Sequence, residues 1–127
     1  AFLVNTMAPL KMAEAFITQI AQSNRKTIVT ITSKMGSVAD NGRGGSYIYR
    51  SSKSAVNMVV KSIAIDLKSN GIISVLLHPG WVRTDMGGPS GLISVEQSVS
   101  GMLSVIREVT STDSGKFIAY DGQIIPW

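Results

Sequence analysis

Two kinds of segment alternate along this chain, and the alternation constrains the fold more than any other feature. Apolar residues recur at three- and four-residue steps, the spacing typical of helices, over residues 5–22, 48–69 and 94–109. Each of these stretches is followed by a short apolar or β-branched run that predicts a strand, at Thr27–Thr32, Ile72–Leu77 and Phe117–Tyr120. Alternating helices and apolar strands favour an α/β fold, in which helices cover both faces of a parallel sheet. We therefore predict the order αβαβαβ within one domain.

The composition of the 127 residues argues against several other classes of protein. Hydrophobic residues make up 44% and charged residues 16%, which suits one globular domain. No apolar run reaches the roughly 18 residues that span a bilayer, and no secretory signal opens the chain, so we expect a cytoplasmic protein without a membrane partner. The net charge of +4 is spread along the chain without a basic cluster, which argues against nucleic acid as a partner. The chain has no cysteine and one histidine, His78, which leaves a metal site without companion ligands.

A tyrosine and a lysine lie one helical turn apart at the start of the second helical stretch. Tyr49 and Lys53 are four residues apart, and residues with this spacing are neighbours on a helix surface. A nearby positive charge favours the ionised form of a phenol, whose pKa is about 10 when unperturbed. A phenol in such surroundings can exchange a proton with a carbonyl oxygen while hydride reaches the carbonyl carbon. The pair predicts a proton-transfer site, although an exposed helix start with a solvated lysine has the same spacing.

Further polar residues are expected on the same rim of the sheet. Ser33 follows the first predicted strand, and His78-Pro79-Gly80 follows the second. In open α/β sheets, ligands bind beyond the carboxyl ends of the strands. Tyr49 begins the helix that joins these two strands, so all three features fall on one rim. Ser33 can then hydrogen-bond a substrate oxygen beside Tyr49, a division of labour that fits hydride transfer in which a cofactor supplies the redox chemistry.

Taken together, these residues resemble the carboxyl-terminal half of a short-chain dehydrogenase/reductase. The resemblance covers nearly the whole chain and rests on Asn5, Ser33, Tyr49-x-x-x-Lys53 and Pro79-Gly80-Trp81-Val82-x-Thr84. Within that family, the segments His78 to Met86 and Tyr120 to Trp127 look most like the C-factor-like and sniffer-like carbonyl reductases. The resemblance implies that residues 1–127 form the C-terminal part of a single Rossmann-like domain.

The resemblance also implies catalytic roles for four residues. Asn5 would anchor a water molecule in a proton relay, and Ser33 would polarise the substrate carbonyl. Tyr49 would act as the catalytic acid or base. Lys53 would be the electrostatic partner of Tyr49 and would contact the ribose of the cofactor.

A nicotinamide cofactor and a small carbonyl or alcohol substrate follow from the same resemblance. Pro79, Gly80, Trp81 and Val82 would line the nicotinamide, and Thr84 would bind its carboxamide or the adjacent phosphate. NADP(H) is expected ahead of NAD(H). The helices at 5–22 and 48–69 resemble those that pair between subunits in the family, so a homo-oligomer is expected as well.

Several alternatives remain open at this point. Asn5 suits a helix cap equally well, and Ser37 or Thr32 lie near enough to Ser33 to compete for its role. His78 is more often packed or bonded in a turn than catalytic. A non-catalytic interaction module built on the same sheet is a rival function. A hydrolase with Ser33 as nucleophile is another, although no nucleophile elbow surrounds this serine.

We expect the chain to be a piece of a longer protein. It opens on apolar residues without an initiator methionine, and the family's glycine-rich dinucleotide loop would lie upstream of Ala1. The cluster Gly42-Arg43-Gly44-Gly45 does not complete G-x-G-x-x-G, because the final position is Tyr47. The chain would then hold half of a cofactor site and have little activity alone.

Overall fold

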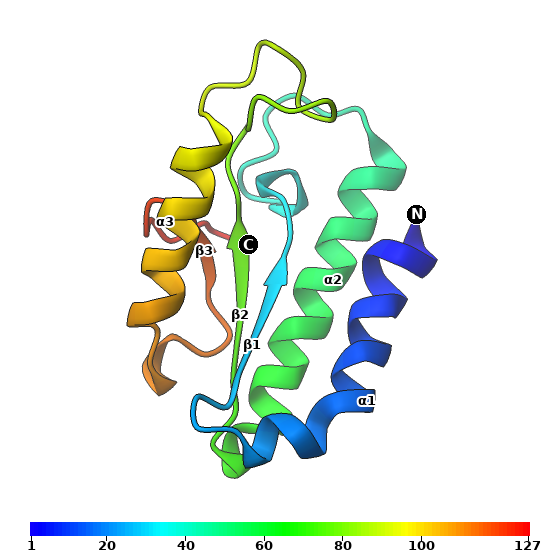
Figure 1. Ribbon diagram of the computed structural model, residues 1–127. Helices are drawn as coiled ribbons and strands as arrows, with labels where there is room; N and C mark the ends of the chain where they lie inside the picture. Colours follow the sequence, from blue (N-terminus) through cyan, green and yellow to red (C-terminus); the bar gives the residue numbers. More distant parts are fainter.

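A three-stranded parallel sheet forms the centre of the molecule (Figure 1), and the computed structural model describes all 127 residues. The strands are β1 (Thr27–Ile31), β2 (Ile73–His78) and β3 (Phe117–Ala119), in the order β1-β2-β3. Thr27 pairs with Ile73, and Leu76 pairs with Phe117, so both neighbours of β2 run parallel to it. The parallel α/β sheet predicted from the sequence is confirmed.

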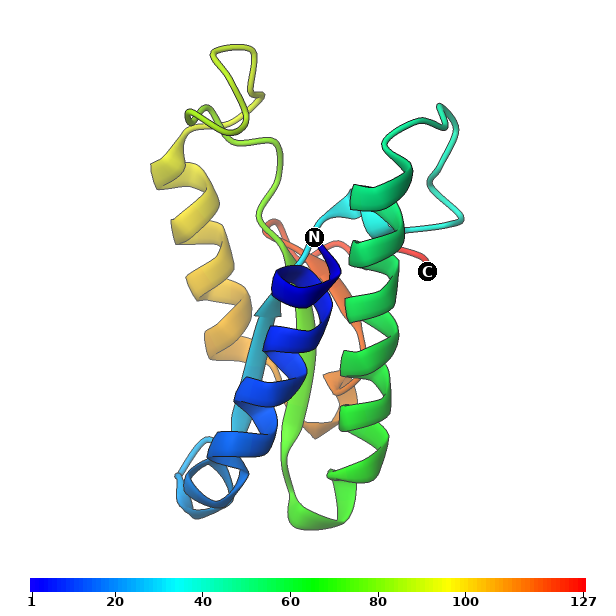
Figure 2. The ribbon, with the colours of Figure 1, turned by 90° about the vertical axis from the view of Figure 1, so that its right-hand side faces the viewer.

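Helices cover both faces of this sheet. One π-helical turn (Leu3–Met7) leads into α1 (Ala8–Gln22), which lies beside α2 (Tyr47–Asp66) on one face. Helix α3 (Val95–Glu108) covers the other face, as the view turned by 90° shows (Figure 2). The predicted order αβαβαβ is thus confirmed. Three short 3₁₀ turns also occur, at Lys34–Gly36, Lys68–Asn70 and Ser111–Asp113.

Buried apolar side chains hold α2 and α3 on opposite faces of β2. On the α2 face, Val56 and Val60 pack in one cluster with Leu76 of β2. On the α3 face, Val75 and Leu77 of β2 pack against partly buried residues that include Met102, Val105, Ile106 and Val109. Alternate residues of a strand point to opposite faces, so a strand buried on both faces is apolar throughout. This explains why β2 has consecutive apolar residues at Val75, Leu76 and Leu77.

Several predicted boundaries differ from those in the structure by one to three residues, and the two at the ends of β2 and α2 are examples. The predicted strand ends at Leu77, but β2 continues through His78, which pairs with Ala119 of β3. The predicted second helix runs to residue 69, but α2 ends at Asp66 and a 3₁₀ turn follows before Gly71, whose φ is +74°. In addition, no helix combines the length and the apolar character that a bilayer crossing requires.

Gly101 lets α3 approach the end of β3 closely. A Cβ atom placed on Gly101 would lie 2.4 Å from the backbone oxygen of Tyr120. We expect Gly101→Ala to lower the free energy of unfolding by about 1–3 kcal/mol, the usual cost of overpacking. Ser104→Ala, at an exposed position of the same helix, should change it by less than about 0.5 kcal/mol. Urea denaturation checks both variants, and a Gly101 variant as stable as the wild type would contradict the close approach.

Candidate active site

Tyr49 and Lys53 lie side by side in the first turns of α2. The helix begins at Tyr47, after Ser46 in a left-handed conformation with φ of +49°. The Nζ atom of Lys53 lies 5.9 Å from the centroid of the Tyr49 ring, close enough for a cation-π contact. Burial lowers the pKa of Lys53 below its usual 10.5, because desolvation penalises the charged ammonium. The spacing of four residues therefore places the cation against the phenol ring, as expected from helical geometry.

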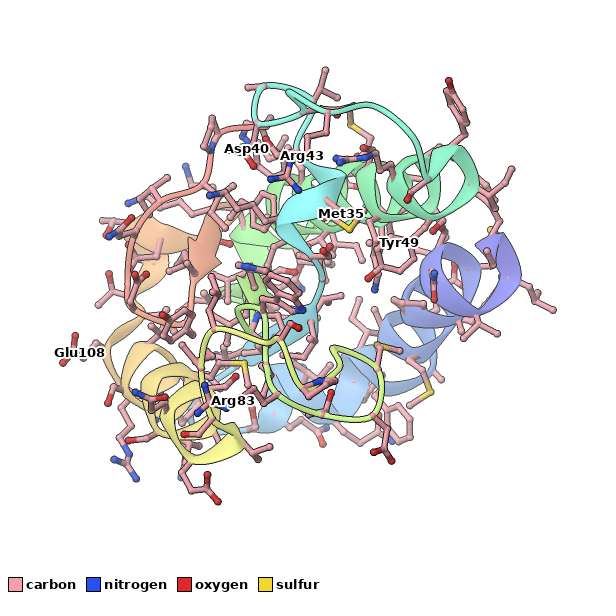
Figure 3. All side chains as sticks on the ribbon, turned by 90° about the horizontal axis from the view of Figure 1, so that it is seen from above. Met35, Asp40, Arg43, Tyr49, Arg83 and Glu108 are labelled. Atoms are coloured by element: carbon pink, nitrogen blue, oxygen red, sulfur yellow. The ribbon has the colours of Figure 1, made fainter.

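A cavity of about 640 Å³ opens at the carboxyl ends of the strands, and Tyr49 points into the hollow beside Met35 (Figure 3). Seven of the nine candidate residues line it: Ser33, Tyr49, Pro79, Gly80, Trp81, Val82 and Thr84. Much of the remaining wall is apolar and includes Met35, Met86, Val95 and Val99. Lys53 and Asn5 do not line the cavity. The ammonium of Lys53 contacts the ring of Tyr49, which does line it.

Among the hydroxyls of Thr32, Ser33 and Ser37, which the sequence leaves as candidates for one role, that of Ser33 alone keeps its proton available. Ser33 Oγ accepts a backbone N–H of its own turn at 3.1 Å and donates to no protein group. Thr32 Oγ1 donates to Asn57 Oδ1 at 2.8 Å, and Ser37 Oγ donates to the carbonyl of Pro126 at 2.5 Å. The geometry therefore favours Ser33 over Thr32 and Ser37.

The turn that follows Ser33 is held against α2 beside Lys53. Ser54 Oγ donates to the backbone oxygen of Gly36 at 2.7 Å. A Cβ atom on Gly36 would lie 2.9 Å from the backbone carbon of Lys53, so only glycine permits this approach. These contacts set the position of Ser33 relative to the Tyr49–Lys53 pair.

The turn Pro79–Gly80, which follows β2, is also held in place by a hydrogen bond and by close packing. Ser98 Oγ donates to the backbone oxygen of Pro79 at 2.6 Å. Gly80 has φ of +87°, a conformation that side chains strongly disfavour. A Cβ atom on Gly80 would lie 2.6 Å from Ile93 Cδ1 and 2.9 Å from Tyr120 Cε1. Proline and glycine at these positions thus form a rigid wall of the cavity.

The loop of residues 81–93 borders the cavity on the α3 side. Its base is closed by a hydrogen bond of 2.9 Å from Arg83 N to Ile93 O. Inside the loop, Thr84 Oγ1 accepts the N–H of Gly87 at 3.1 Å. A hydroxyl is both donor and acceptor, so the proton of Thr84 remains available to a ligand.

Asn5 contacts α2 rather than the cavity. It lies inside the π-helical turn Leu3–Met7, so its interpretation as a helix cap is wrong. Its Nδ2 donates to Ser52 Oγ at 3.1 Å, and Ser52 Oγ donates to the backbone oxygen of Tyr49 at 2.8 Å. Asn5 therefore connects the start of the chain to the helical turn that holds Tyr49.

The wall of the cavity carries no side chain that is charged at neutral pH. Its one titratable residue besides Tyr49 is His78, and burial, with a smaller contribution from the Lys34 cation, lowers the pKa of His78 to about 4. The ring is therefore neutral at pH 7. Its Nδ1 accepts the N–H of Lys34 at 3.1 Å and makes no hydrogen bond to Ser33, so the Ser-His pair of a hydrolase is not formed. No group of three His, Cys, Asp or Glu side chains is placed to hold a metal ion.

Several residues that shape this site were not predicted from the sequence. Gly36, Ser52 and Ser98 hold the main chain near Ser33, Tyr49 or Pro79, and Met35 and Met86 supply apolar wall. Gly36, three residues after Ser33, indicates a turn in the sequence. The sequence contains no comparable signal for the other four residues. Ser98 lies 19 residues from Pro79, and the bond from Asn5 to Ser52 spans 47 residues, so neither serine belongs to a local motif.

Comparison with known proteins places the chain in a family. The family described as short chain dehydrogenase matches residues 1–92. The chain belongs to the short-chain dehydrogenase family. The resemblance inferred from the sequence is thus confirmed, and the fold is Rossmann-like.

Proteins with similar sequences and structures are known. C-signal of Myxococcus xanthus is 44% identical over 126 residues, which cover 99% of this chain and 76% of C-signal. The carbonyl reductase Sniffer of D. melanogaster has a TM-score of 0.94 at 36% identity. An NADPH-bound carbonyl reductase from chicken fatty liver has a TM-score of 0.92 at 34% identity. This chain is covered to 99% in both cases but spans only 55% of each reductase. The predicted likeness to C-factor-like and sniffer-like reductases is confirmed.

Proposed function

We propose that the protein containing these residues is a nicotinamide-dependent oxidoreductase that interconverts a small carbonyl compound and its alcohol. The observation that carries the proposal is the meeting of Ser33 and Tyr49 in one cavity, with Lys53 Nζ 5.9 Å from the Tyr49 ring centroid. The braced turn Pro79–Gly80 forms another wall of the same cavity. Membership of the short-chain dehydrogenase family supports this combination of hydroxyl, phenol and ammonium as a redox site.

The cavity fits the nicotinamide end of the cofactor. Trp81 and Val82 offer it an apolar surface, and the available hydroxyl proton of Thr84 suits a carboxamide or phosphate oxygen. When bound, the cofactor supplies or receives the hydride. The adenosine end has no glycine-rich loop within residues 1–127, and we propose that residues outside this chain bind it. The 127 residues would then be the C-terminal part of one Rossmann domain.

The side chains of this chain would hold the substrate and move its proton. Ser33 donates a hydrogen bond to the substrate oxygen and keeps it beside Tyr49. The phenol of Tyr49 gives its proton to that oxygen during reduction and takes it back during oxidation. The positive charge of Lys53 stabilises the phenolate that remains. Asn5 Oδ1 accepts no hydrogen bond from the protein and is left to bind a water molecule that returns the proton.

We propose NADP(H) as the cofactor ahead of NAD(H). We also propose that the protein is cytoplasmic and that it forms a homo-oligomer. The similar carbonyl reductase from chicken fatty liver, whose structure contains NADPH, supports the choice of cofactor. Subunits would pair through the helices at 5–22 and 48–69. Exposed apolar side chains on these helices support that pairing, and they include Met12, Phe16, Met58 and Ile65.

The function is tested on the complete protein encoded around these residues. We expect steady oxidation of NADPH when it is mixed with an aromatic aldehyde or a diketone, and slower oxidation of NADH. The 127-residue chain by itself is expected to turn over little, because it lacks the other half of the cofactor site. Loss of nucleotide absorbance measures both. No turnover with aldehydes, ketones or diketones, and none with the matching alcohols in the reverse direction, would reject the proposal.

A non-catalytic interaction module is the second candidate function. Two observations favour it: a relative that covers 99% of this chain carries the name C-signal, and apolar side chains such as Phe16 and Met58 are exposed. Light scattering combined with nucleotide titration separates the two functions. A module assembles without binding NADPH, whereas the oxidoreductase binds it.

A further inference from the structure

His78 joins three segments that meet at the rim of the sheet. It is the last residue of β2 and the only histidine of the chain. Its ring accepts the backbone N–H of Lys34, in the turn after β1, at 3.1 Å from Nδ1. Its backbone oxygen accepts the N–H of Tyr120, just after β3, at 2.8 Å. The side chain lies between the cavity of the candidate active site and a second cavity of about 450 Å³, since it lines both.

The contact with Lys34 determines which ring nitrogen of His78 carries the proton in the neutral form. A backbone N–H can only donate, so Nδ1 must keep its lone pair and the neutral ring must carry its proton on Nε2. The surroundings favour this neutral form, because burial and the Lys34 cation outweigh the carboxylates of Asp121 and Asp40. The hydrogen bond is therefore intact at neutral pH and is lost only when acid protonates Nδ1.

We propose that His78 is a positioning residue for the Ser33 hydroxyl, through the hydrogen bond that its Nδ1 accepts from Lys34. The inference rests on the proposed oxidoreductase function. Ser33 precedes Lys34 in the chain, and Pro79 follows His78, so this bond ties the substrate-holding turn directly to the nicotinamide wall. The bonds from Ser54 to Gly36 and from Ser98 to Pro79 each hold one of the two turns but do not join them.

Three substitutions separate this role from simple packing. The amide oxygen of asparagine takes the place of Nδ1, and that of glutamine takes the place of Nε2, whereas leucine has no acceptor. We expect His78→Asn to keep kcat within about twofold of the wild type. We expect His78→Gln and His78→Leu to lower kcat by about three- to tenfold, the effect of one lost hydrogen bond. The KM for NADPH should change by less than about twofold in all three variants, because the main cofactor contacts remain.

Nitrogen NMR of the complete protein provides a readout that does not depend on turnover. The signals of His78 are assigned by their loss in the His78→Asn variant. They should show an unprotonated Nδ1 and a protonated Nε2 at pH 7, and they should titrate near pH 4. A proton on Nδ1 at pH 7 would overturn the inference. A His78→Leu variant with wild-type kcat, or a His78→Asn variant as impaired as His78→Leu, would overturn it too.

The two proposals fail in different ways. A wild-type protein without any carbonyl or alcohol turnover rejects the oxidoreductase function, and the positioning role is rejected with it. An active wild-type protein with the wrong histidine tautomer rejects the positioning role alone.

Discussion

Replacing Tyr49 by phenylalanine is expected to lower kcat for carbonyl reduction by about 100- to 10,000-fold, the range over which a positioned acid acts. The variant keeps the aromatic ring beside Lys53 and loses only the hydroxyl. The cavity keeps its wall of Met35 and Trp81, so the KM for NADPH should change little. Steady-state kinetics on the complete protein, with an aromatic aldehyde as substrate, measures both constants.

Tyr47 provides the matched control for this substitution. It lies two residues earlier at the start of the same helix, and its side chain is 82% exposed. Tyr47→Phe removes the same hydroxyl from a position outside the cavity and should leave kcat within about twofold of the wild type. A Tyr49→Phe variant that retains more than about a tenth of the wild-type kcat would show that another group supplies the proton.

Replacing Lys53 by methionine is expected to lower kcat by about 100-fold, comparable to the loss of one electrostatic group in an active site. The ammonium that we propose to stabilise the phenolate of Tyr49 is then absent. The melting temperature should stay level or rise, since Lys53 is partly buried and its charge is penalised by desolvation. A lower kcat together with an unchanged or higher melting temperature would indicate that Lys53 acts in the reaction and not in folding. A variant that loses both activity and stability would instead indicate a structural role.

The pH dependence of stability gives a second check on Lys53. The folded protein holds this proton less tightly than the unfolded chain, because the pKa is lowered from 10.5. Below the folded pKa the cost of burying the charge is fully present, and it disappears as the pH rises to about 10.5. The wild type should therefore gain stability relative to Lys53→Met across that interval. Lys61→Met, at an exposed position two turns later on the same helix, is the matched control for the loss of a lysine.

The strands could be predicted from the sequence because each is a short, mainly apolar or β-branched run bounded by polar residues, glycine or proline. The run at Phe117–Tyr120 differs from β3 by one residue. Helix ends were harder to predict, since the apolar period continues through Leu67 although α2 ends at Asp66. The Lys68–Asn70 turn repeats helical spacing over only three residues, and sequence periodicity does not separate it from a helix.

The site could be predicted in part because its motifs are local. Tyr49 and Lys53 are one helical turn apart, and Pro79 and Gly80 are adjacent, so spacing alone brings each pair together. The residues that brace them act over long distances in the chain. Ser98 reaches Pro79 across 19 positions, and such a contact leaves no periodic trace. The availability of the Ser33 proton likewise became visible only when the partners of Thr32 and Ser37 were known.

The contrast between a fixed frame and an exposed side chain of the cavity wall has an evolutionary consequence. Pro79 and the turn after Ser33 are fixed by hydrogen bonds from α3 and α2, whereas Met86 is 94% exposed on the 81–93 loop. Mutations at Met86 would leave Ser33, Tyr49 and Lys53, the proposed reacting groups, in place. Selection can therefore change which compounds are accepted without rebuilding the chemistry, and duplicated genes of this lineage would be expected to diverge along that loop first.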